Sequence, residues 1–295
     1  MVELGPSLIG YADVPCHQGL ARLATHALLA EAALTPKPAL VDQRGSGAHG
    51  DLTLKKMRRS AYAIEPFFVE LASAAAGRIP DSMLREQLGQ IGRRAEAAML
   101  GATGGSNSHR GAIWALGLLT AAAVMRTSSW LTAPGIATQA AEIASLPDKG
   151  ATVVVSHGLS AGVRYGVRGA RGEAQLGFPH VISIGLPMLR RRRMEQHSER
   201  YARLDTLLAI MAVLDDTCLL HRGGIAGLAT AKQGASEVLD LGGAATDRGM
   251  KRIIELDAEL LRHNASPGGS ADLLAATLFL DNLESGTGLL AYGND

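Results

Sequence analysis

The sequence is poor in cysteine, in aromatic residues and in excess charge of either sign. Of its 295 residues only two are cysteines, Cys16 and Cys218, and they form neither a CxxC motif nor a zinc-binding spacing. Aromatic residues make up 4% of the chain, and 29 Lys and Arg residues face 28 Asp and Glu residues. Because there is no overall field to recruit nucleic acid or an anionic membrane, any bound anion must be met by a local cluster of cations.

Long apolar runs and a secretory signal pattern are also lacking. Apolar stretches such as 112–125 fall short of the roughly 20 residues that a bilayer span requires, and no charged, apolar, small-residue signal pattern opens the sequence. With so few cysteines, the reducing cytoplasm is the expected compartment.

Alanine and leucine dominate the rest of the chain, and apolar residues recur at intervals of three and four, as expected for helices. The one β-branched cluster, 153–155, is too short to found a sheet. We therefore predict a single all-α domain over 1–295, with 147–150 as a candidate hinge. The predicted helices span 16–34, 51–76, 81–99, 109–126, 135–146, 152–164, 178–196, 199–217, 224–241, 246–263 and 270–285.

Five connections between these helices combine glycine with residues that can do chemistry. They read PKPALVDQRGSGAHGD, GATGGSNSHRG, YGVRGARGEAQLGFP, DDTCLLHRGG and NASPGGSADLL. Each has a purely structural interpretation, because glycines end helices and Ser or Asp cap them. Glycine also lets the backbone approach a ligand, and five such loops in one chain predict a shared site.

The segment around 103–110 has the composition of a phosphate-binding helix start. Unpaired backbone N–H groups at such an end attract phosphate oxygens, and an arginine adds a fork of donors. No Walker GK[ST] follows, so any phosphate site here uses another scaffold. The predicted substrate-binding residues in this segment are Gly104, Gly105, Asn107, His109 and Arg110.

The other loops supply carboxylates and further cations. Asp42, His49 and Asp51 lie within ten positions of one another, and a hard cation such as Mg²⁺ prefers the two carboxylates. Asp51 alone is also explained as an ordinary first-turn carboxylate. The remaining candidates are Arg168, Arg171 and Glu173, then Asp215, Asp216, His221 and Arg222, and finally Asp272 beside a Gly-Gly turn. The run 190–193 is interpreted as a solvated helix face.

Taken together, the five segments resemble the triphosphoribosyl-dephospho-CoA synthases, which make the prosthetic-group precursor for the acyl carrier subunits of citrate lyase and malonate decarboxylase. The matching stretches run from PKPALVD at 36–42 to SPGGSADLLAATLFL at 266–280 and cover nearly the whole chain. The form LDDTCLLHRGG looks closer to the malonate decarboxylase branch. Arg110 stands where many relatives have Lys, which keeps the charge but alters its geometry.

The resemblance implies transfer of the triphosphoribosyl group of ATP to the ribose 2′-hydroxyl of 3′-dephospho-CoA, with release of adenine. A carboxylate would stabilise the oxocarbenium-like sugar, and a base would take the hydroxyl proton. Glu173 and Asp216 are the candidates for these two roles, in either order, and His49 is a third catalytic candidate. Asp42 and Asp51 would hold Mg²⁺ on the triphosphate. The expected phosphate donors and substrate contacts include His109, Arg110, Arg168, Arg171, His221, Arg222 and Asp272.

Two alternatives stay open from the sequence. A nucleoside or ADP-ribosyl hydrolase would share the sugar chemistry but use water, and a non-catalytic module binding CoA or a carrier protein would need only the arginines. The clustered carboxylates speak against the second. The expected partners are ATP and 3′-dephospho-CoA, with the product passed on to an acyl carrier subunit, and neither nucleic acid nor membrane is expected. A homodimer is an open possibility.

Overall fold

The protein is seen here in a computed structural model that describes residues 16–125, 132–151 and 157–286. Within these ranges every regular element is a helix, apart from an isolated bridge between Asp42 and Gly45, so the predicted all-α fold is confirmed. The helices are α1 (His17–Ala33), α2 (Leu54–Ala75), α3 (Ser82–Thr103), α4 (Arg110–Ala122), α5 (Ala133–Ser145), α6 (His157–Tyr165), α7 (Gly169–Gln175), the π-helical turn η1 (Val181–Gly185), α8 (Leu186–Met194), α9 (Glu199–Val213), α10 (Thr217–Asp240), α11 (Asp247–Arg262) and α12 (Gly268–Ser285).

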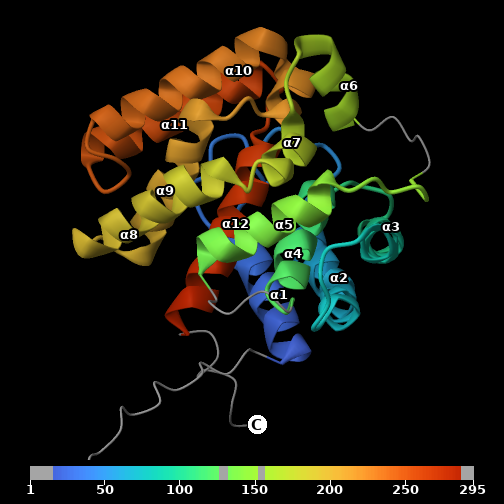
Figure 1. Ribbon diagram of the computed structural model, residues 1–295. Helices are drawn as coiled ribbons and strands as arrows, with labels where there is room; N and C mark the ends of the chain where they lie inside the picture. The colour runs from blue at the N-terminus through green and yellow to red at the C-terminus, as the bar shows by residue number, and fades with distance from the viewer. Residues whose placement is uncertain (1–15, 126–131, 152–156, 287–295) are drawn as a thin grey trace, which may run out of the picture.

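Helix α12 runs through the centre of the molecule and packs against α1, α4 and α9 (Figure 1). Its sequence explains this position, since 273–280 is buried on every side of the helix and a helix that is apolar all round belongs in a core. The other helices cover it from two sides. One set comprises α1 to α5, and the other comprises α8 to α11.

Helices α10 and α11 form an antiparallel pair at one edge of the molecule (Figure 1). On α11 the residues Ile253, Leu256 and Leu260 are buried, at the three- and four-residue spacing of an amphipathic helix. One continuous hydrophobic core joins residues of α1 to residues of α12, which supports the prediction of one compact domain. None of the described helices is long and apolar enough to cross a bilayer.

Three predicted element boundaries are wrong. The segment interpreted as a glycine-rich loop contains α7, and the predicted helix over 178–196 starts with the π-helical turn η1 instead of regular α-helix. Helix α10 begins at Thr217, seven residues earlier than predicted, because Asp216 caps it. The predicted start at 224 is where Gly224, with φ of 63°, breaks the helical backbone inside α10.

Two sequence-based expectations concern the segment after α5. The candidate hinge at 147–150 is tied to α3, because Asp148 pairs with Arg85 and Arg93 at 3.4 and 2.8 Å. The β-branched cluster at 153–155 lies outside the described residues, as does the first part of the helix predicted over 152–164.

Candidate active site

The glycine-rich segments meet at one pocket of about 830 Å³, as predicted. Its wall is built from the loop between α1 and α2, the N-terminus of α4, helix α7, and the adjoining N-termini of α10 and α12. Such a volume is typical of a small-molecule site. The predicted residues on this wall are His49, Asp51, Gly105, Asn107, His109, Arg110, Glu173, Asp216, His221, Arg222 and Asp272.

His109 is the N-cap residue of α4 and is buried against Ser60 of α2. The Ser108 hydroxyl donates to the Ser60 hydroxyl at 2.7 Å, and Ser60 contacts Nδ1 of His109 at 2.8 Å. Because the Ser60 hydroxyl then donates its own proton to Nδ1, Nδ1 is an acceptor and Nε2 of His109 carries the ring proton. Burial, with the nearby charge of Lys37, lowers the pKa of His109 to about 3. The imidazole is therefore neutral at physiological pH, and its buried Nε2 has no hydrogen-bond partner in the described residues.

The turn before α4 is held by its own polar groups. Gly104 ends α3 with φ of 71°, and Asn107 accepts a hydrogen bond from the backbone of Arg110 at 3.2 Å. The Arg110 side chain donates to Glu96 at 3.0 Å. Arg110 therefore already has a carboxylate partner at the edge of the pocket, and any phosphate that it binds must share the guanidinium with Glu96.

A buried ion pair that the sequence analysis missed joins α1 to the loop after it. The Lys37 ammonium donates to both the carboxylate and the backbone carbonyl of Glu31, and both side chains line the pocket. The signal for Glu31 was available, since it follows Leu20, Ala24 and Ala27 on the apolar face of the first predicted helix. A carboxylate on such a face needs a buried partner.

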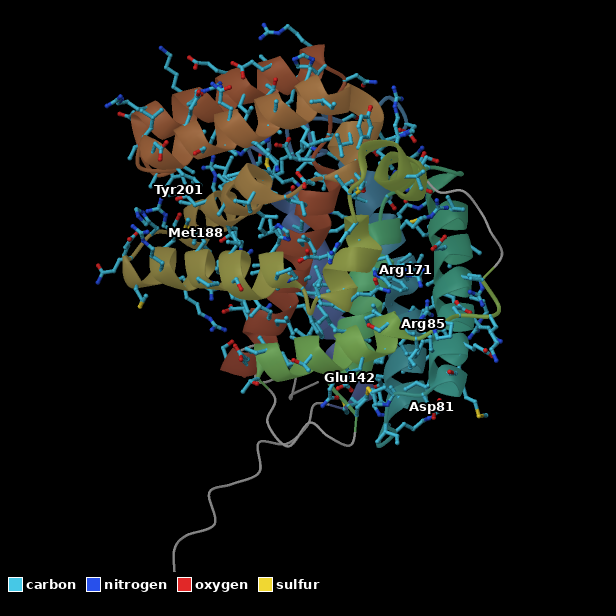
Figure 2. All side chains as sticks on the ribbon, turned by 45° about the horizontal axis from the view of Figure 1, so that its top comes forward. Asp81, Arg85, Glu142, Arg171, Met188 and Tyr201 are labelled. Carbon is cyan, nitrogen blue, oxygen red and sulfur yellow. The ribbon has the colours of Figure 1, made fainter. Side chains whose placement is uncertain are left out.

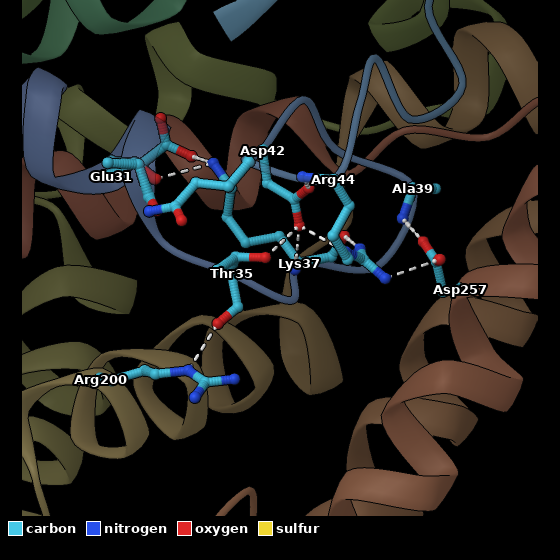
Figure 3. Close-up of polar contacts among 10 residues, drawn as sticks. Glu31, Thr35, Lys37, Ala39, Asp42, Arg44, Arg200 and Asp257 are labelled. Atoms are coloured by element: carbon cyan, nitrogen blue, oxygen red, sulfur yellow. Dashed lines mark hydrogen bonds and ion pairs between the residues drawn. The ribbon is translucent and has the colours of Figure 1, made fainter.

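Asp42 does not line the pocket, so its predicted pairing with Asp51 around one Mg²⁺ does not fit. Its carboxylate accepts hydrogen bonds from the Thr35 hydroxyl, the Lys37 backbone, and both the backbone and side chain of Arg44, at 2.7–3.0 Å (Figure 3). Burial alone would raise the pKa of Asp42, but these donors outweigh it and lower the pKa. Arg44 also donates a hydrogen bond to Asp257 of α11 at 3.0 Å. Through Arg44, Asp42 therefore anchors the loop between α1 and α2 to α11.

His49 is held between Arg222 and Ser266. Arg222 donates to Nδ1 at 3.0 Å, which leaves the proton of the neutral imidazole on Nε2, 3.0 Å from the Ser266 hydroxyl. Burial, together with the charge of Arg222, lowers the pKa of His49. Arg222 also donates to the Ala48 carbonyl and to Asn264. Both ring nitrogens thus have partners, which makes His49 a link between loops in this arrangement.

Glu173 projects into the pocket from α7 and is oriented by His180. One carboxylate oxygen accepts from the backbone N–H of His180 at 2.9 Å, and the other lies 2.7 Å from its Nδ1. Glu173 is 6% exposed. Next to it, Gly172 is required, because a Cβ there would collide with the side chain of Arg168.

Asp216 joins the first turns of two helices. One oxygen accepts from the backbones of Cys218, Leu219 and Gly269, and the other accepts from the backbone and hydroxyl of Ser270. Burial raises the pKa of Asp216, and these donors oppose that shift. With five hydrogen bonds to a carboxylate that is 1% exposed, Asp216 has the environment of a structural cap. Its neighbour Asp215 points outward to Lys232 at 2.6 Å.

Two predicted phosphate donors, Arg168 and Arg171, are not part of the pocket wall. Arg168 is the N-cap residue of α7. Arg171 lies near Arg85 of α3 (Figure 2). Burial is the main cause that lowers the pKa of Arg85, and the charge of Arg171 lowers it further. Asp272 does line the wall, as do His221 and Cys218 of α10.

The described residues include no cluster of three or more His, Cys, Asp or Glu side chains that could hold a metal ion. Of the two predicted ligands, only Asp51 lines the pocket, where its exposed carboxylate lies 3.8 Å from Nδ1 of His49. Mg²⁺ is commonly held by one or two carboxylates together with substrate phosphates. The site therefore fits a cation that arrives with a triphosphate, with Asp51 as the candidate protein ligand.

Comparisons with known proteins identify the family of the chain. The family model described as ATP:dephospho-CoA triphosphoribosyl transferase matches residues 17–290. Proteins named 2-(5''-triphosphoribosyl)-3'-dephosphocoenzyme-A synthase from Pseudomonas fluorescens Pf-5 and Pseudomonas aeruginosa UCBPP-PA14 are each 56% identical, over 90% and 91% of this chain and 92% of theirs.

A crystal structure from Archaeoglobus fulgidus, named for a triphosphoribosyl-dephospho-CoA synthase, shares the fold. Its TM-score is 0.51, with 18% identity over 76% of this chain and 97% of that one. The match of the family model over nearly the whole chain, together with the relatives of 56% identity, leads to one conclusion: the chain is a transferase that belongs to the ATP:dephospho-CoA triphosphoribosyl transferase family.

Proposed function

We propose that this enzyme transfers the 5-triphosphoribosyl group of ATP to the ribose 2′-hydroxyl of 3′-dephospho-CoA and releases adenine. The observation that carries the proposal is the pocket of about 830 Å³, in which carboxylates and cations from five segments lie together. The family and the names of the relatives support these two substrates. The motif LDDTCLLHRGG at 214–224 favours the malonate decarboxylase branch as the user of the product.

The carboxylates on the described part of the pocket wall have different proposed roles. Glu173, oriented by His180, is the proposed base that takes the proton of the 2′-hydroxyl. Asp216 holds the N-termini of α10 and α12 in place beside the reacting sugar. Mg²⁺ on Asp51 would neutralise charge on the triphosphate, which stays intact because the bond that breaks is at C1 of the ribose.

The phosphates are expected near the exposed part of the wall, where Arg110, Arg222 and Asn107 lie. The buried part of the wall is more apolar and includes Leu28 and Phe178, which suits a nucleobase. Because ATP and 3′-dephospho-CoA both carry adenine, the pocket and its exposed rim have to accept two nucleotides at once.

Incubation with ATP, Mg²⁺ and 3′-dephospho-CoA, followed by chromatography, tests the proposal. We expect adenine and the triphosphoribosylated product in equal amounts, with both substrates required and no phosphate released. Adenine formed at the same rate without an acceptor would favour the hydrolase alternative. Binding of dephospho-CoA without any turnover would favour the non-catalytic module.

A further inference from the structure

Asp272 differs from the other carboxylates on the described part of the pocket wall, because no basic side chain pairs with it. Among the described residues, its carboxylate accepts a hydrogen bond from the backbone N–H of Ala112 and from no side chain. The others have stronger partners: Glu31 with Lys37, Glu96 with Arg110, Glu173 with His180, Asp215 with Lys232, and Asp216 with five donors, while the exposed Asp51 lies 3.8 Å from His49.

A glycine of α4 leaves room for the Asp272 carboxyl group. Asp272 lies just past the first turn of α12, against the first turn of α4, where a Cβ on Gly111 would collide with its Oδ2. The residue is partly exposed on the pocket wall. The side chain of Asp272 therefore lies close against α4, while the residue still lines the pocket.

The surroundings of Asp272 favour the protonated carboxyl group. Burial is the largest effect that raises its pKa, and the carboxylates of Glu31 from α1 and Asp216 before α10 add to it. Cys218 also interacts with Asp272 and stays a thiol, because burial and then the charges of Asp216 and Asp272 raise the pKa of Cys218. From α4, the nearby His109 is neutral. The one buried ammonium on this wall, Lys37, is bound to Glu31.

We propose that Asp272 is the acid that protonates the leaving adenine, an assignment that rests on the proposed transferase function. The carboxyl proton moves to a ring nitrogen of adenine, N7 or N3, while the electron pair of the N9–C1′ bond moves into the ring and adenine departs. The 2′-oxygen of 3′-dephospho-CoA bonds to C1′, and its proton goes to Glu173. Return of that proton to Asp272 through water completes the cycle without any further reactant.

Asp272→Asn tests the proposal, because the amide keeps the size and polarity of the side chain but has no acidic proton. We expect single-turnover adenine release to fall by about 10²- to 10⁴-fold, while the Kd for ATP, measured by calorimetry, changes by less than about threefold. The exposed Asp240→Asn on α10 is the matched control and should keep the wild-type rate.

Deaza analogues of ATP locate the proton transfer. In 7-deaza-ATP or 3-deaza-ATP the nitrogen that accepts the proton is replaced by carbon, so the wild type should be slow with one of them. With that analogue, the Asp272→Asn substitution should slow adenine release little further. Equal losses with ATP and both analogues, or an Asp272→Asn rate equal to that of Asp240→Asn, would overturn the assignment while leaving the transferase function intact. A wild-type enzyme that releases no adenine would instead refute the proposed function, and this assignment with it.

Discussion

Ser270 donates two hydrogen bonds to one oxygen of Asp216, from its backbone N–H at 2.8 Å and from its hydroxyl at 2.9 Å. Because Asp216 also caps α10, this contact fixes the first turn of α12 against the first turn of α10. Pocket residues of both helices lie in these turns or just after them, so one buried carboxylate sets their mutual position.

We expect Asp216→Asn to destabilise the fold. The amide –NH₂ replaces one acceptor and faces N–H and O–H donors, and an unsatisfied buried group costs about 1–3 kcal/mol. Asp215→Asn is the matched control, since it removes only a partly exposed pair with Lys232, worth about 0–1 kcal/mol. Urea denaturation of both variants measures the difference, and equal stabilities would contradict the role of Asp216 as a double cap.

Glu173→Gln should fold normally and turn over slowly. The amide oxygen of the substituted side chain can still accept the backbone N–H of His180, and Nδ1 of His180 can accept from the new –NH₂ when its proton is on Nε2. Loss of a general base typically lowers the rate by about 10²- to 10⁴-fold. Adenine release is the measurement, with the exposed Glu255→Gln of α11 as control. Normal turnover with a small change in Tm would show that Glu173 has only a structural role.

Asp42 and Asp51 should respond in opposite ways to removal of their charge. Asp42→Asn loses hydrogen bonds to a charged acceptor, each worth about 1.5–3 kcal/mol, and should lower stability without changing the Mg²⁺ concentration needed for activity. Asp51→Asn should leave the Tm unchanged and raise that Mg²⁺ requirement. Thermal melts and Mg²⁺ titrations of the two variants make the comparison. A raised Mg²⁺ requirement in both variants would restore the ligand pair predicted from the sequence.

The lowered pKa of Asp42 adds a pH dependence to the same comparison. Its stabilising contribution is fully present above the pKa of the unfolded state, about 3.9, and is lost as the pH falls toward the lower pKa of the folded state. The stability difference between wild type and Asp42→Asn should therefore shrink as the pH falls from about 3.9 toward the lower pKa of the folded state.

His109 should make the protein sensitive to mild acid. Its pKa is about 3 in the folded state against 6.5 ordinarily, so below pH 6.5 the unfolded state binds a proton that the folded state does not. Stability should fall by roughly 1.4 kcal/mol per pH unit between these values. His109→Gln should flatten this part of the profile in urea denaturation at pH 7, 6 and 5. An unchanged slope would mean that His109 is charged in the folded protein.

Most helices were predictable, because the spacing of apolar residues depends on local sequence alone. The short helix α7 was not predictable in this way. Its sequence GARGEAQ places Gly169 and Gly172 in one short helix, which local propensity disfavours. Gly172 is there for the packing of Arg168, a cause that only the tertiary structure shows. The early start of α10, by contrast, had a local signal, since Asp216 caps it through the backbone N–H groups of Cys218 and Leu219.

The composition of the site was predictable to the extent that ligand-facing residues occur beside glycines. Glu173, His109 and Asp272 were found in this way and lie on the pocket wall. The same signal also selected Asp42, because an anchored loop and a binding loop use the same residue types. Lys37 was missed, since the sequence does not reveal that a lysine between two prolines folds back onto Glu31.

The central position of α12 has a consequence for synthesis of the protein on the ribosome. This helix is the last of the described elements, yet it packs against α1, which is the first. Synthesis at about 5–20 residues per second leaves the apolar faces of α1 and α4 without their final partner until the C-terminal helix has emerged. These apolar faces are therefore open to chaperones while the segments between α1 and α12 are synthesised, and the pocket is completed only once α12 has emerged.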